Sequence, residues 1–98
     1  METELMEVDN GAVLKLTGRL DTKTAKEASE TFSKVGEQYD NVTLDMAGIS
    51  YISSAGIRAI RNLYMILYRK GGKLAVTNPG DVVVQVFQMT GLASLFDL

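Results

Sequence analysis

The first apolar positions of the chain predict two strands joined by a tight turn. Residues Glu4–Val8 have the composition of a weak strand, and the apolar run Ala12–Thr17, bounded by Gly18, predicts a second one. The intervening Asp9–Gly11 segment contains Asn-Gly, which tolerates the positive φ angles of a hairpin turn. The chain is therefore expected to open with a β-hairpin.

The period of the pattern then changes to that of a helix between Thr24 and Val35. The apolar positions on one face of this helix are Ala25, Ala28, Phe32 and Val35. Thr24 and Glu27 match a capping box, which predicts where the helix begins, and Gly36 suits its end.

The pattern in the second half of the chain predicts a strand, a helix and a second strand. Val42–Met46 predicts a short strand, and the strongest helical pattern follows over Ser54–Lys70. Gly71 and Gly72 end that helix, and Lys73–Thr77 predicts a buried strand. This order predicts parallel pairing of the two strands through a right-handed crossover.

The segment after Pro79 is ambiguous because Val82–Phe87 has the composition of a strand. Against that, Asn78 can cap a helix, Pro79 fits a first turn, and Asp81 suits the positive end of a helix dipole. We therefore predict a helix here, followed by a short helical turn at Leu92–Phe96. The whole pattern predicts an α/β fold with a mixed sheet of four to five strands and about four helices.

The length and the net charge of the chain limit which kinds of protein it can be. Ninety-eight residues form one small domain, residues 1–98, and a net charge of −2 argues against direct nucleic-acid binding. The longest apolar run, Leu63–Tyr68, is too short to cross a bilayer, and no secretion signal opens the chain. We expect a cytoplasmic domain that does not insert into a membrane.

The absence of Cys and His argues against most enzyme chemistry. Without them the chain has no disulfide, no thiolate nucleophile, no common transition-metal ligand and no Ser-His-Asp triad. Turn and cap positions explain Asp21, Asp45 and Asp81 separately, so neither a metal site nor a bound cofactor is expected. The chain is predicted to be a binding or regulatory module and not an enzyme.

Two serines stand where the long helix begins, at the end of the segment Leu44–Ile57. Capping alone can explain them, with Ser53 as the cap, Ser54 in the first turn and Gly56 allowing close packing. A phosphate on Ser54 would also face the free N–H groups of that turn, and Arg58 lies one turn further on. The same positions therefore suit a switch operated by phosphorylation.

One stripe of the long helix is polar and basic. Its positions are Arg58, Arg61, Asn62, Met65 and Arg69. A solvated helix face is the favoured explanation of the stripe, and the alternative is a basic docking strip for an acidic partner, contiguous with Ser54. Residues 46–80 contain no acidic residue at all.

Several segments in this order resemble the STAS domain, the fold of bacterial anti-sigma factor antagonists. The resemblance is carried by Leu44–Ile57, by Leu16–Asp21, by Gly71–Leu74 and by Thr90–Phe96. It covers almost the whole chain, so a STAS-like single domain is the expected fold.

The resemblance implies a regulatory mechanism. In such switches the unphosphorylated domain binds an anti-sigma factor that is also an ATP-dependent serine kinase, which frees a sigma factor. The kinase, which uses the ATP, then phosphorylates a serine, and a serine phosphatase removes the phosphate. Alignment on Gly56 places the acceptor at Ser54, with Ser53 as the alternative, and Asp21 matches the family's acidic loop residue. Family members often carry Asp immediately before the acceptor, where this chain has Ser53.

The predicted partner-binding residues are Asp21, Thr22, Ser53, Ser54, Gly56, Ile57, Arg58 and Arg61. The replacement of Asp by Ser53 motivates an alternative, a STAS adaptor subunit of a transport or signalling complex that is not phosphorylated. An enzyme with Ser54 as nucleophile lacks an activating base. The protein is expected to be a monomer or a weak dimer.

Overall fold

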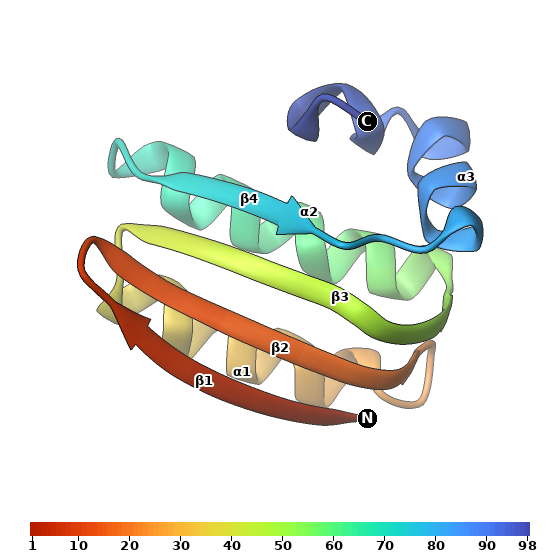
Figure 1. The fold of residues 1–98 in the computed structure, drawn as a ribbon, viewed down its shortest axis with the longest axis horizontal. Coiled ribbons are helices and arrows are strands. Elements are labelled where there is room, and N and C mark those ends of the chain that lie inside the picture. The colour runs from red at the N-terminus through yellow and green to blue at the C-terminus, as the bar shows by residue number, and fades with distance from the viewer.

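The computed structural model describes all 98 residues, which form one mixed sheet with helices packed against it. The strands are β1 (Glu2–Val8), β2 (Gly11–Leu20), β3 (Asn41–Ile52) and β4 (Lys73–Thr77). The helices are α1 (Ala25–Gln38), α2 (Ser54–Arg69), α3 (Asp81–Thr90) and the 3₁₀ helix η1 (Leu92–Phe96). The sheet order is β1-β2-β3-β4, antiparallel between β1 and β2 and parallel elsewhere (Figure 1). The predicted α/β fold, the hairpin and the parallel crossover are confirmed.

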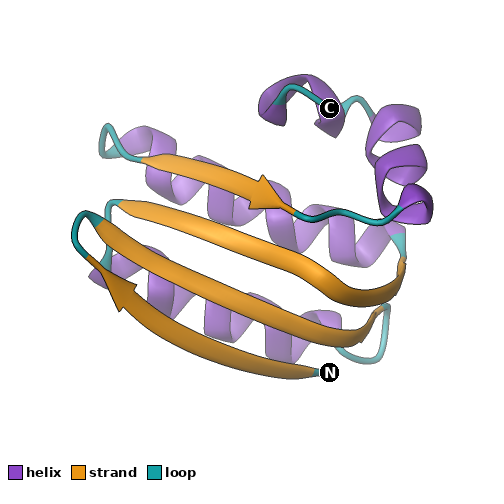
Figure 2. Ribbon diagram, in the orientation of Figure 1, coloured by secondary structure: helices purple, strands orange, loops and turns teal.

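The sheet is covered on one face only. Helices α1 and α2 lie side by side behind it, and α3 and η1 lie beyond β4 (Figures 1 and 2). In β2 the alternate residues Ala12, Leu14 and Leu16 are buried against the helices, whereas Lys15 and Thr17 are exposed on the open face. Such alternation is what a sheet with one solvated face requires.

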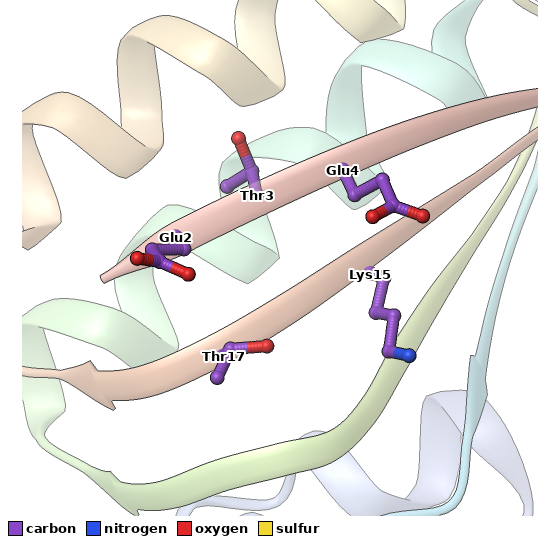
Figure 3. Close-up of a pocket in the computed structure, with 5 residues that line it drawn as sticks. All are labelled: Glu2, Thr3, Glu4, Lys15 and Thr17. Atoms are coloured by element: carbon purple, nitrogen blue, oxygen red, sulfur yellow. The ribbon is translucent and has the colours of Figure 1, made fainter.

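The open face carries polar side chains around the first half of β1, and the exposed apolar side chains Met6 and Val8 follow on the same face. A small depression of about 180 Å³ there is lined by Glu2, Thr3, Glu4, Lys15 and Thr17 (Figure 3). Glu4 and Lys15 are register partners across β1 and β2. Opposite charges at facing positions suit a solvated sheet surface.

The core is a single cluster of 21 buried hydrophobic residues between the sheet and the helices. Phe32 of α1, Leu63 of α2 and Phe87 of α3 are at most 1% exposed. No polar or charged side chain is buried. Packing of apolar faces therefore holds the helices in place, and the polar chemistry is left to the surface.

Three strands and one helix are longer than their patterns predicted, and β1 begins at Glu2 instead of Glu4. Strand β2 continues beyond Gly18 to Leu20, and β3 continues beyond Met46 to Ile52, because register shifts keep the two strands paired. Gly36 does not end α1 but is buried inside it, where a Cβ would lie 3.0 Å from Ile66 of α2. Its role is close packing of two helices.

The helix predicted after Pro79 is confirmed, but its start differs. Asn78 does not cap α3: it lies in the left-handed region at φ +56°, and its side-chain amide donates to Asp45. Gly80 occupies the cap position instead. Likewise, Thr24 stands at the N-cap of α1 without a side-chain cap bond, because its hydroxyl oxygen accepts from the Asp21 N–H at 2.9 Å while the hydroxyl donates to the Arg19 carbonyl.

Candidate functional site

The junction between β3 and α2 places the two serines in different roles. Ser53 is the N-cap of α2: its hydroxyl oxygen accepts from the Gly56 N–H at 3.3 Å, and its carbonyl accepts from the Ile57 N–H at 2.9 Å. Ser54 is the first residue of the helix and is exposed. Ser53 is thus a cap, as predicted, and the neighbouring hydroxyl faces solvent.

Close packing of backbone fixes the position of this junction. A Cβ on Gly56 would lie 2.7 Å from both Leu20 Cγ and the Leu20 carbonyl oxygen, so no side chain fits there. The same carbonyl accepts from the Ser53 N–H at 2.9 Å. The start of α2 is therefore held against the end of β2, and the serines are presented on a rigid element.

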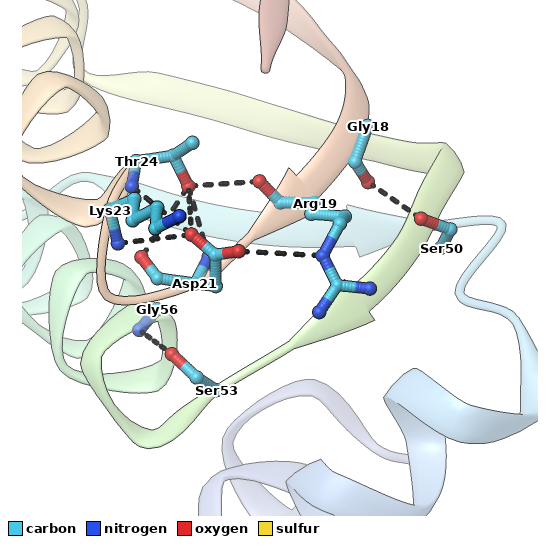
Figure 4. Close-up of polar contacts among 8 residues, drawn as sticks. All are labelled: Gly18, Arg19, Asp21, Lys23, Thr24, Ser50, Ser53 and Gly56. Atoms are coloured by element: carbon cyan, nitrogen blue, oxygen red, sulfur yellow. Dashed lines mark hydrogen bonds and ion pairs between the residues drawn. The ribbon is translucent and has the colours of Figure 1, made fainter.

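Asp21 organises the loop between β2 and α1, beside this junction (Figure 4). Its Oδ1 accepts from the backbone N–H groups of Lys23 at 3.0 Å and Thr24 at 3.2 Å, and Arg19 Nε lies 3.4 Å from Oδ2. Desolvation acts to raise the pKa of Asp21, but these hydrogen bonds outweigh it and the net pKa is lowered. Asp21 is therefore ionised at neutral pH.

A shallow depression of about 420 Å³ joins the loop to the junction. It is lined by Arg19, Asp21, Thr22, Lys23, Tyr51 and Ser53. The structure thus brings together three of the predicted residues, Asp21, Thr22 and Ser53, from segments about 30 positions apart. Ser54 adjoins the depression in sequence but does not line it.

Arg19 and Tyr51 are site residues that the sequence did not indicate. The Arg19 guanidinium carbon lies 4.3 Å from the centroid of the Tyr51 ring, a cation–π contact. The two residues are register partners in β2 and β3, after the second register shift. Both residues lie in segments that carry the STAS resemblance, but only the strand pairing shows that they are in contact.

The remaining predicted residues divide by burial. Arg58 and Arg61 are exposed on α2, and Arg61 Nη2 donates to the Thr90 carbonyl of α3 at 3.5 Å. Gly56 and Ile57 are buried, Ile57 to 3% exposure, so they shape the site from inside and present no surface. Of the predicted partner-binding residues, Thr22, Ser54, Arg58 and Arg61 are therefore the exposed ones.

The carboxylate of Asp45 lies at another place on the sheet. Hydrogen bonds from the Ala47 N–H and the Asn78 amide lower its pKa against a smaller effect of burial. No three acidic side chains converge where a metal ion could bind. None of the helices has the length and hydropathy that crossing a bilayer demands.

Comparison with known proteins agrees with this architecture. The anti-sigma-B factor antagonist of Bacillus subtilis is 20% identical over 98 residues, covering 100% of this chain and 90% of that protein. The anti-sigma F factor antagonist of Paenibacillus polymyxa is 23% identical over 88 residues, covering 88% and 75%.

Solved structures show the same fold. An anti-sigma factor antagonist from Mycobacterium paratuberculosis superposes with a TM-score of 0.88 at 21% identity, covering 97% of this chain and 81% of that one. The phosphorylated form of the Bacillus cell fate determinant SpoIIAA gives 0.76 at 21% identity, covering 97% and 88%. The family model of the STAS domain matches residues 3–98. The chain belongs to the STAS domain family.

Proposed function

We propose that this chain is an anti-sigma factor antagonist switched by phosphorylation of Ser54. In this proposal the unphosphorylated domain binds an anti-sigma factor that is also a serine kinase, which frees a sigma factor. A serine phosphatase restores the active form. The names of the similar proteins support the class of function. The observation that carries the switch is the exposed Ser54 hydroxyl at the first position of α2.

The different roles of the two serines favour Ser54 as the acceptor. The Ser53 hydroxyl is held by the Gly56 N–H, so a phosphate on it would displace the cap of α2. A phosphate on Ser54 disturbs no such bond and lies at the positive end of the helix dipole. Arg58, one turn further along the exposed side, is placed to pair with it.

The effect on a partner follows from charge. A phosphate adds about −1.5 to −2 charges at neutral pH. Even where Arg58 pairs with this charge, removing both groups from water in an interface costs a few kcal/mol, and each 1.4 kcal/mol is about tenfold in affinity. Loss of about two decades of affinity is therefore expected on phosphorylation.

Phosphopeptide mass spectrometry tests the acceptor. The chain is incubated with ATP and its cognate anti-sigma serine kinase, as parent, Ser53→Ala and Ser54→Ala. We expect phosphate on the parent and on Ser53→Ala, and none on Ser54→Ala. Phosphate on Ser53 alone would move the acceptor by one position, and phosphate on neither serine would remove the switch.

The affinity of unphosphorylated variants of this chain for the kinase tests the consequence. Ser54→Asp, a crude charge mimic, is expected to bind about a hundredfold more weakly than the parent, and Ser54→Ala to bind like the parent. Gln38→Glu is a matched control, because it adds one charge at an exposed position at the end of α1. Equal loss of affinity in both charged variants would contradict a local effect at Ser54.

One observation favours a second candidate function. The cap position beside Ser54 is a serine, where many switching relatives have an acid, and a kinase that reads that acid would not recognise this chain. A STAS adaptor subunit of a transport or signalling complex needs no such recognition. Affinity purification that recovers a transport complex and no serine kinase would establish the adaptor in place of the switch.

A further inference from the structure

The two edges of the sheet differ in what lies beside them. Helices α3 and η1 lie beyond β4, whereas β1 is the outermost element at the other edge (Figure 1). All seven residues of β1 are exposed, and none of the backbone hydrogen bonds made outside the helices and strands involves this strand. The strand also has no proline and no bulge, two features that often block an exposed edge. The outer edge of β1 is therefore open to pairing with another strand.

The hairpin turn determines which backbone groups of β1 are free. Asp9–Asn10 is a two-residue turn, and Val8 and Gly11 on either side of it are register partners. Residues that flank such a turn form a hydrogen-bonded pair, and hydrogen-bonded pairs alternate along antiparallel strands. The even-numbered residues of β1 therefore bond to β2. The residues whose N–H and C=O groups point outward are Thr3, Leu5 and Glu7.

The three glutamates of β1 are not three isolated charges along this edge. Glu4 faces Lys15 across the hairpin, and the Glu7 carboxylate accepts from the Tyr39 hydroxyl. Only Glu2, at the first position of the strand, has neither a facing cation nor a hydrogen bond. Two of the three acids thus have a partner within the chain, which reduces their power to repel a second strand.

The order of residues in β1 selects one way of pairing with a second copy. The outward groups of two antiparallel strands are in phase, with the longest overlap, when a two-fold axis passes through Glu4, Leu5 or Met6. An axis at Glu4 sets this glutamate against its own copy, and like charges at facing positions are destabilising. An axis at Met6 leaves the first two residues of the strand unpaired. An axis at Leu5 pairs all seven residues.

With the axis at Leu5, the two copies of the strand complement each other. The facing pairs are Glu2 with Val8, Glu4 with Met6, Glu7 with Thr3, and Leu5 with itself. No glutamate therefore opposes a glutamate. Leu5 is 41% exposed and lies on the helix face of the sheet, because its register partner Leu14 is buried there, so the two Leu5 side chains cover apolar surface at the axis. Pairing with an unrelated strand does not require such self-complementarity, which favours a second copy as the occupant.

We propose that β1 pairs antiparallel with β1 of a second copy, centred on Leu5, so that two four-stranded sheets become one continuous sheet. The contact is isologous and closes on itself, so it forms a dimer and not a fibre. One strand edge buries less than the roughly 1,200 Å² of a standard interface, and the dimer is therefore weak. Ser54 lies on α2 and takes no part in the contact, so the dimer does not depend on the proposed switch.

Sedimentation velocity of the whole chain, from about 10 µM to about 1 mM, tests the association; we expect monomer at the low end and dimer at the high end. Leu5→Pro removes an outward N–H at the axis but none of the bonds to β2, and it should weaken the dimer about tenfold or more. Leu5→Thr is the matched control, because it keeps that N–H, and it should weaken the dimer about threefold or less. A parent that stays monomeric at about 1 mM, or an equal loss in both variants, would overturn the proposal.

Two charge variants test the register. Val8→Lys and Met6→Lys each place a cation opposite a glutamate of the other copy, twice in the dimer, and each should strengthen association about threefold to tenfold. An axis at Glu4 leaves Val8 unpaired, and an axis at Met6 sets the two new lysines against each other, so only the axis at Leu5 predicts a gain in both variants. Met89→Lys adds the same charge at a side chain that is 86% exposed on α3, and it should associate like the parent. A gain in only one of the β1 variants, or an equal gain in Met89→Lys, contradicts the proposed pairing.

Amide hydrogen exchange measures the pairing of the backbone itself. The outward N–H of Leu5 should exchange rapidly at about 10 µM and slowly at about 1 mM, because only the dimer supplies it with an acceptor. The N–H of Met6, which bonds to β2, should be protected equally at both concentrations. If Leu5 remains unprotected in a sample that sediments as a dimer, the copies associate through another surface and the proposal is wrong.

Discussion

The two ends of α2 differ in how they are built and in what they offer to a partner. At its start, Gly56 packs against Leu20 and leaves no room for a side chain, while Ser53 closes the turn. At its end, Gly71 has open space around it but a φ of +78°, and the neighbouring surface is aromatic. One glycine is needed for space and the other for conformation. The start of α2 therefore presents polar side chains on a tightly packed backbone, and its end presents an apolar, aromatic surface.

The largest effect is expected from Gly56→Ala. Its Cβ would come within 2.7 Å of the Leu20 carbonyl oxygen, which is backbone and cannot move aside cheaply. We expect a loss of about 3 kcal/mol in the free energy of unfolding, measured by urea denaturation. Gly80→Ala is the control: no atom lies within 4 Å of its added Cβ, so only a cap preference of about 1 kcal/mol or less is at stake. Equal midpoints for the two variants would show that packing does not fix the start of α2.

Gly71→Ala probes the other end. The Gly72 N–H donates to the Leu67 carbonyl and the Gly71 N–H to the Tyr68 carbonyl, which is a Schellman closure with Gly71 in the left-handed position. An alanine there costs about 1 to 2 kcal/mol of unfolding free energy, through conformation alone. Gly71→Asn should recover part of the loss, since Asn tolerates this region better. If Asn and Ala destabilise equally, crowding and not φ governs this end.

The sequence predicted those features of both ends that depend on neighbouring residues. Capping chemistry identified Ser53, and the glycine pair after Lys70 located the end of the helix. The residues that flank Val82–Phe87 predicted a helix although the run itself is rich in β-branched residues. That helix is confirmed, with Asp81 and Gly91 at the two ends of α3. In each case the physical cause lies within one helical turn.

Features that depend on distant segments were not predicted. The contact of Arg19 with Tyr51 exists only because β2 and β3 shift register twice before those residues meet. The aromatic contact near the end of α2 requires Phe96 of η1 to reach Tyr64, from a segment 32 positions later. No local period contains either relation. The site at the start of α2 was therefore found in part, and the aromatic contact near its end was not found at all.

A pH experiment sharpens the comparison through Asp21. Because the pKa of Asp21 is lowered in the folded state, its ionised form contributes stability above the unfolded pKa of about 3.9, and that contribution is lost as the pH falls through the folded pKa. Parent and Asp21→Asn are compared by urea unfolding at about pH 6 and about pH 3. The parent should be more stable than Asp21→Asn at the higher pH. The difference in unfolding free energy between the two proteins should be smaller at the lower pH. Asp45, whose pKa is also lowered, is present in both proteins and cancels. A difference in unfolding free energy that is larger at the lower pH would contradict a lowered pKa of Asp21 in the folded state.

The smallest effect is expected at the end of α2, where Lys70 Nζ lies 3.2 Å from Asp40 Oδ1. The Asp40 side chain is 73% exposed, so the pair is screened by water and contributes about 0.5 kcal/mol or less. Asp40→Asn removes the charge and leaves the Asp40 carbonyl bonded to the Lys73 N–H at 2.9 Å. The difference in unfolding free energy should vanish in about 1 M salt, where the Debye length is about 3 Å. A larger, salt-independent loss would mean that side-chain charge holds this end of the helix, whereas the geometry assigns that role to the backbone around Gly71 and Gly72.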